Sequence, residues 1–368
     1  MDKIHGSWTG KVVGSAFGMP FEGKDPRWIA QEFGQVAGWQ EAHGRGGGVV
    51  NDDEQFELAA LICMEREGVA GFTLEKVAKC WRELLNRQFL FTAERQVYLN
   101  WRKGIPVNEA AEPRNNPFFD FIGGQMKGEI FGQVAPGDLD GAARLARVDG
   151  AVAHHGVGVD GEVFVACLVS KAVASDAHSV PNGPALEEDV REALARCDQR
   201  GAYVELAEVV LRWWADYPEP RGWKVAFSNL QRWWREEAVP ELERAEEEAP
   251  THPGRERLLR GMREQPWVVC HVLPNAGILL LALLYGKGDF SQTMQLAAMM
   301  GHDADCNAGN LGGILGAYAG RSHLPAYWAD FVNDEIMAVV KDWEDPSLTR
   351  LAMRVHALAE VAEPKRGA

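Results

Sequence analysis

Apolar residues recur at helical spacing along most of the chain, and few segments alternate in the way that strands do. From Phe56 the apolar positions fall three or four residues apart, which predicts a helix. Further helices are predicted over 163–173, 204–214, 276–284, 290–300 and 330–343. Loops are predicted at 178–190 and 215–222, where turn-forming residues gather. The segment 235–258, dense in Glu and Arg, is predicted to be a solvated helix or a surface excursion.

Small residues form two stripes at helical spacing. Gly10, Gly14 and Gly18 lie four residues apart, and a second stripe runs through 308–317. A glycine inside a helix costs about 0.5–1 kcal/mol relative to alanine, so such stripes are tolerated where another backbone must come close. We therefore predict two buried central helices in close contact. They indicate one compact all-α domain over 1–362, followed by a frayed tail at 363–368.

Composition narrows the possible partners and location. The formal net charge is −15, which disfavours nucleic acid and anionic membrane surfaces, because both attract clustered cations. We find no run of about 18 apolar residues and no signal-peptide pattern, so no membrane-spanning helix is expected. The six cysteines contain no CxxC spacing, which favours reduced thiols and a cytoplasmic location. The oligomeric state is not determined by the sequence.

Two acidic motifs stand at predicted helix starts. Residues 51–54 (NDDE) precede the helix at Phe56, and residues 301–307 (GHDADCN) precede the second small-residue helix. Helix capping explains one carboxylate in each motif. Each motif supplies two within three residues, and converging carboxylates repel one another unless a cation lies between them. Oxygen ligands of this kind suit Mg²⁺, Mn²⁺ or Ca²⁺ rather than zinc.

Three segments, in this order, resemble the ADP-ribosylglycohydrolase family: GKVVGSAFGMPFE, NDDEQF and GHDADCNAGNLGGILGAYAG. The resemblance covers roughly 5–70 and 270–325 and implies an all-α orthogonal helical bundle with a two-magnesium site, at which Mn²⁺ is also possible. The metal ligands that it implies are Asn51, Asp52, Asp53, Asp303, Asp305 and Cys306. Asn51 and Cys306 replace hydroxyl ligands of the family, and sulfur is a poor magnesium ligand. One of the two ions is therefore expected to bind weakly, differently or not at all.

The resemblance also implies functional roles. Glu22, Asp53 and Asp303 are the candidate catalytic residues. The candidate substrate-binding residues are Glu129, His154, His155, Gly156, Gly158, His271 and Asn275. Each has a structural alternative: Glu129 as a buried, partnered acid, for example, or the histidine pair as a polar helix end.

The expected activity is metal-dependent hydrolysis of an N- or O-ribosyl bond. The substrate is a small ribosyl or nucleotide molecule or an ADP-ribosylated protein. Two alternatives remain open. One is a non-catalytic relative that binds ADP-ribose or a nucleotide, and the other is a structural protein whose acids only cap helices.

Overall fold

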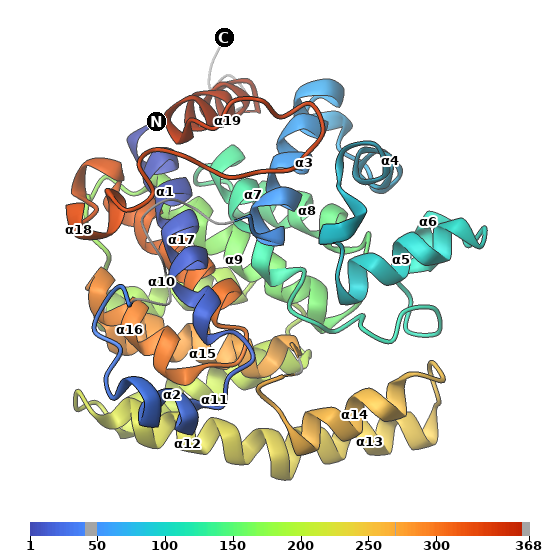
Figure 1. The fold of residues 1–368 in the computed structure, drawn as a ribbon, viewed down its shortest axis with the longest axis vertical. Helices are drawn as coiled ribbons and strands as arrows, with labels where there is room; N and C mark the ends of the chain where they lie inside the picture. Colours follow the sequence, from blue (N-terminus) through green and yellow to red (C-terminus); the bar gives the residue numbers. More distant parts are fainter. Residues whose placement is uncertain (41–49, 269, 363–368) are drawn as a thin grey trace.

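The computed structural model describes residues 1–40, 50–268 and 270–362 (Figure 1). Helices make up 69% of it, and these residues form no strand beyond isolated bridges, so the all-α prediction is confirmed. None of the described helices is long and apolar enough to cross a membrane. The helices are α1 (Asp2–Gly18), α2 (Pro26–Phe33), α3 (Asp52–Glu67), α4 (Leu74–Leu84), α5 (Thr92–Arg102), α6 (Val107–Ala110), α7 (Glu129–Val134), α8 (Leu139–Gly150), α9 (Val157–Ala174), α10 (Pro184–Leu194), α11 (Ala202–Asp216), α12 (Gly222–Trp233), α13 (Val239–Glu248), α14 (Arg255–Glu264), α15 (Val272–Gly286), α16 (Phe290–Met300), α17 (Ala304–Ala319), α18 (Ala326–Ala329) and α19 (Leu348–Ala362).

Helices α1 and α17 run antiparallel in direct backbone contact along their length at the centre of the molecule (Figure 1). A Cβ added to Gly10 would lie 2.0 Å from the carbonyl oxygen of Gly312, and one added to Gly14 would lie 1.9 Å from that of Ala308. No larger residue fits at these positions without moving a helix, so the predicted close approach of the two small-residue stripes is confirmed. The end of α1 meets the start of α17, where a Cβ on Gly18 would lie 2.1 Å from the oxygen of Ala304.

The hydrophobic core surrounds this pair of helices. Helices α9, α15 and α17 are buried on nearly every side, as expected for helices whose apolar residues are not confined to one stripe. The peripheral helices α4 and α12 instead bury one face. The core cluster runs from Ile4 to Val355 without separating into two groups of residues.

Two local predictions were wrong. The segment 330–343 is not helical, because Asn333, Asp334 and Asp342 have positive φ, a left-handed conformation that no right-handed helix accommodates. Helix α10 occupies most of the predicted loop 178–190. It begins at Pro184, which has no N–H and therefore suits the first turn of a helix.

The predicted loop at 215–222 is present between α11 and α12. The Glu- and Arg-rich segment forms α13 and α14, a hairpin along the lower edge of Figure 1. The tail at 363–368 lies outside the described residues.

Candidate active site

A pocket of about 290 Å³ opens where the end of α1 meets the starts of α3, α5 and α17. Its acidic lining residues are Glu22, Asp52, Glu94, Asp303 and Asp305. No lysine or arginine among the described residues lines it. The structure therefore places the two acidic motifs and Glu22 around one pocket, to which the described residues contribute five carboxyl groups and no basic side chain.

The second acidic motif supplies the most closely spaced group of candidate ligands. Asp303 precedes α17, whose first turn contains Asp305 and Cys306, and ligand atoms of these three residues lie within 4.8 Å of one another. The Oδ1 atoms of both aspartates are buried without a hydrogen-bond partner. Burial, followed by the charges of Asp305 and Glu22, raises the pKa of Asp303 well above its ordinary value. Two buried, unpartnered carboxylate oxygens beside each other suit a bound cation.

The first acidic motif is joined to the second through Asn51. Its Oδ1 accepts a hydrogen bond from the Asp53 N–H at 3.2 Å and so caps α3, while its Nδ2 donates to Asp305 Oδ2 at 3.1 Å. The capping interpretation therefore holds for Asn51, whose oxygen is engaged by the helix. Asp52 faces the pocket, and burial, then the charge of Asp53, raises its pKa well above the ordinary value.

Asp53 is fully buried and is not among the residues that line the pocket. Its Oδ1 accepts a hydrogen bond from the Cys306 thiol at 3.3 Å, and its Oδ2 lies 3.5 Å from Lys11 Nζ. Burial raises the pKa of Asp53 to about 7, although Lys11 opposes the change. Burial also raises the pKa of Cys306 well above its ordinary value, so the residue remains a thiol that donates to Asp53.

Lys11, which the sequence analysis missed, joins the acidic groups behind the pocket. Its Nζ lies 3.1 Å from Glu57 Oε1 and 3.2 Å from Glu129 Oε2, and Asn310 Nδ2 donates to Glu129 Oε1 at 2.8 Å. Glu129 is thus a buried, partnered acid and not a pocket residue. The sequence did contain a signal for this role, because Lys11 lies in the middle of a glycine-rich helix that was predicted to be buried. A buried lysine requires a carboxylate partner.

Glu22 lies at the mouth of the pocket, just beyond α1. The adjacent loop is tied to the second acidic motif by a hydrogen bond of 2.8 Å from the Gly23 N–H to the His302 carbonyl. The charge of Asp305, and then burial, raise the pKa of Glu22 to about 7. A carboxyl group with such a pKa can accept and release a proton near neutral pH.

His154 supports the pocket from behind. Its Nε2 lies 3.5 Å from Oε1 of Glu94, a pocket residue, and both side chains are buried. Burial lowers the pKa of His154 to about 3, so the ring is neutral, and burial raises the pKa of Glu94 to about 7.

The neighbouring residues His155, Gly156 and Gly158 do not line the pocket. The N–H of His155 donates to the carbonyl of Phe119 at 3.0 Å, and a Cβ on Gly158 would lie 2.5 Å from that same oxygen. These residues hold the segment leading to Gly123, which does line the pocket. Their observed contacts are structural.

His271 and Asn275 are also buried outside the pocket lining. His271 Nε2 lies 3.1 Å from Asp120 Oδ2. Asn275 Oδ1 accepts hydrogen bonds from the Asp303 N–H at 3.3 Å and from Asn307 Nδ2 at 2.7 Å. Asn275 therefore positions the backbone of the second acidic motif.

The uncharged wall of the pocket was not predicted. Besides Asn51 and Cys306, its uncharged residues are Met19, Val50, Phe89, Phe91, Thr92, Ile122, Gly123, Met126 and Cys270. Phe91 is 50% exposed and stands at the start of α5. These residues come from loops and helix ends that only the tertiary packing brings together, and no sequence motif marks them.

The fold and the pocket define an all-α protein with an acidic site that is suited to cations. The family model for ADP-ribosylglycohydrolase matches residues 1–365, and the chain therefore belongs to that family and is a hydrolase of the glycohydrolase type. A solved structure described as an ADP-ribosylglycohydrolase-related protein complex is similar, with a TM-score of 0.50 and 16% identity over 98% of each chain. At that identity the likeness shows the fold alone. No curated protein matches the chain in sequence.

Proposed function

We propose that this chain is a metal-dependent hydrolase of an N- or O-ribosyl bond and that it acts with Mg²⁺ or Mn²⁺. The observation that carries the proposal is the pocket with five carboxyl groups and no basic side chain among the described residues. Asp52, Asp303 and Asp305 would hold the cation, because they line the pocket and two of them have buried, unpartnered oxygens. Members of this family generally bind divalent metals.

A second ion would bind less firmly than the first. Asp53, its expected ligand, already contacts Lys11 and the Cys306 thiol, while the oxygen of Asn51 caps α3. A thiol is a poor ligand for a hard cation. The two replacements for hydroxyl residues thus support one strong and one weak metal position.

When bound, the cation would supply positive charge that grips ribose hydroxyls and orients a water molecule. Glu22, at the mouth, would transfer a proton to or from the reacting groups. The surrounding carboxylates would stabilise positive charge developing at the anomeric carbon. A pocket of about 290 Å³ is at the small end of ligand sites, which span about 300–1,000 Å³. It suits the ribosyl unit, with the rest of the substrate outside.

The test is hydrolysis of ADP-ribosyl-arginine, ADP-ribosyl-serine, NAD and free nucleosides, each with Mg²⁺ and with a chelator. We expect at least one substrate to release ribose or ADP-ribose, and we expect chelation to stop the reaction. Glu22→Gln should lower kcat by about 10²–10⁴-fold, the usual contribution of a general acid or base. Glu32→Gln, an exposed glutamate on α2, is the matched control.

Binding of ADP-ribose without turnover of any substrate would contradict the hydrolase proposal. That result would favour the non-catalytic alternative, which the engaged Asn51 oxygen and the Cys306 thiol also support.

A further inference from the structure

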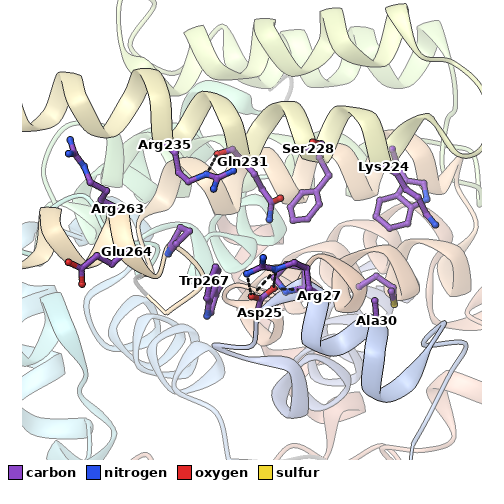
Figure 2. A pocket seen from close by; sticks show the side chains of 15 residues that line it. Asp25, Arg27, Ala30, Lys224, Ser228, Gln231, Arg235, Arg263, Glu264 and Trp267 are labelled. Carbon is purple, nitrogen blue, oxygen red and sulfur yellow. Dashed lines mark hydrogen bonds and ion pairs between the residues drawn. The ribbon is translucent and has the colours of Figure 1, made fainter.

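A second, larger hollow of about 590 Å³ is lined by residues outside the candidate active site (Figure 2). One side of the hollow is formed by α12 and the turn of helix that follows it, and the other side by α2 and the segment 263–267. We name this hollow the α2–α12 groove. The ring of Phe227, which lines the groove, is edge-on to the His302 imidazole with 6.3 Å between ring centroids. His302 directly precedes Asp303, which lines the acidic pocket, although the groove and the pocket have no lining residue in common.

The charge of the groove is opposite to that of the chain as a whole. Four cationic and two acidic residues line it, whereas the chain carries a net charge of −15. Arg27 is paired with Asp25 at 2.6 Å, and Arg263 is paired with Glu243. Within the described residues, no carboxylate lies within ion-pair distance of the other two, Lys224 and Arg235. Lys224 Nζ lies 5.6 Å from the centroid of the Trp223 ring, and Arg235 Nε donates to the Gln231 carbonyl at 3.3 Å, so neither charge is neutralised. Both are exposed.

The polar residues of the groove follow one line along a helix. Lys224, Ser228 and Gln231 recur at four and three residues, which places them on one face of α12, and Arg235 follows in the π-helical turn Trp234–Ala238. Figure 2 shows the four in a row above Arg27 and Trp267. Eleven residues of helix span about 16 Å. A ligand that reaches both free cations must be extended over that length, as about five residues of extended polypeptide are.

The remaining lining is aromatic. Trp223, Phe227 and Trp267 line the groove, and the Arg27 guanidinium lies over the Trp267 ring at 5.9 Å from its centroid. Such surfaces bury apolar side chains and the stems of polar ones, while the free cations attract acidic groups. A compact anion would reach one end of the row only.

We propose that the α2–α12 groove binds an extended acidic segment of a polypeptide partner. Lys224 and Arg235 pair with carboxylates at the two ends of the segment, and Trp223 and Trp267 pack against its side chains. The inference goes beyond the proposed hydrolase activity and does not require turnover.

The test is the binding of a fluorescein-labelled peptide of alternating glutamate and alanine to the full chain, followed by fluorescence anisotropy. The same peptide with glutamine in place of glutamate is the ligand control. We expect the glutamate peptide to bind, the glutamine peptide to bind at least about tenfold more weakly, and added salt to weaken binding. In Lys224→Glu/Arg235→Glu we expect the Kd to rise by at least about tenfold.

The matched control is Lys79→Glu/Lys341→Glu, which makes the same change of charge at two exposed lysines outside the groove. It should bind as the wild type does. Lys224→Gln/Arg235→Gln tests the same cations with a smaller change of charge and should also weaken binding. Circular dichroism establishes that each variant is folded.

Equal affinity for both peptides, equal loss in the control variant or unchanged affinity in both groove variants would overturn the proposal. Displacement of the peptide by ADP that is abolished in Lys224→Glu/Arg235→Glu would also overturn it, in favour of a nucleotide site. Asp303→Asn/Asp305→Asn should bind the peptide normally, which separates a failure of the groove from a failure of the hydrolase proposal.

Discussion

Two groups of buried carboxylates in this molecule differ in the source of their positive charge. In the first, Lys127 contacts Asp149 and lies 2.9 Å from Glu162 Oε2, and all three side chains are fully enclosed. In the second, Asp52, Asp303 and Asp305 face a pocket that no described basic residue lines. The first group is closed and has a lysine of the chain itself as its partner, whereas the second leaves oxygens available to a cation from solution.

The pKa values follow the same division. Although burial opposes it, the charges of Asp149 and Glu162 raise the pKa of Lys127 above its ordinary value, so the lysine remains charged. In the pocket, burial raises the pKa of both Asp303 and Asp305, and no described lysine counters the effect. The comparison teaches that a lysine marks an acidic cluster as structural, and that its absence marks a cluster as a candidate binding site.

The largest expected effect comes from removing the internal cation. Lys127→Met leaves Asp149 and Glu162 buried without a partner, so we expect the free energy of unfolding to fall by about 3–5 kcal/mol. Urea denaturation measures the change. The exposed Lys79→Met is the control and should change stability by no more than about 0.5 kcal/mol. Equal small effects for the two variants would contradict the comparison, because the buried Asp149 and Glu162 would then not depend on Lys127 as their partner.

Removing the pocket acids should have a different consequence. We expect saturating Mg²⁺ to stabilise the wild type, by about 2.7 kcal/mol at a hundredfold excess over Kd. Asp303→Asn/Asp305→Asn should lose this gain and should not be less stable than the wild type without metal, because two repelling charges are gone. Denaturation with and without Mg²⁺ measures both effects.

For this experiment the control is Asp140→Asn/Asp330→Asn, which removes two exposed acids and should keep the metal response. A wild type that gains no stability from Mg²⁺ or Mn²⁺ would argue against a cation site.

A third expected effect is a pH dependence of stability without metal. Burial raises the folded-state pKa of Asp53 from 3.8 to about 7 and that of Glu94 from 4.5 to about 7. The folded state therefore holds protons that the unfolded state releases, so this contribution is complete below about pH 4 and is lost as the pH rises toward 7. We expect stability to decline across that window and saturating Mg²⁺ to make the decline shallower. Denaturation series at several pH values measure it, and a rise in stability across the window would contradict it.

The sequence predicted much of the centre of the fold and little of its edges. The glycine stripes of α1 and α17 indicated their contact, because few other arrangements justify glycine inside a helix. The pairs of carboxylates in the two motifs exceeded what caps require, and these motifs do lie around one pocket. The segment 330–343 was misjudged because its apolar spacing is helical while Asn333, Asp334 and Asp342 adopt left-handed conformations.

The rest of the site depends on contacts across the sequence. Phe89 and Phe91 belong to no motif, and their place in the pocket wall follows from where the connection between α4 and α5 lies in the fold. Several of the expected substrate-binding residues, such as Glu129 and Asn275, lie one layer behind the pocket, where they hold Lys11 and the Asp303 backbone. Spacing along a chain does not separate a residue that lines a pocket from one that supports it.

The contact between α1 and α17 has a consequence for the order of folding. Residues 2–18 pack against residues 304–319, so α1 meets its main partner only after the long segment between them has been synthesised. Roughly 300 residues separate the two, and at about 5–20 residues per second the ribosome needs about 15–60 s to make them. The acidic pocket is therefore completed late. A nascent chain that stops before α17 lacks the second acidic motif, and it also lacks the helix that covers the glycines of α1.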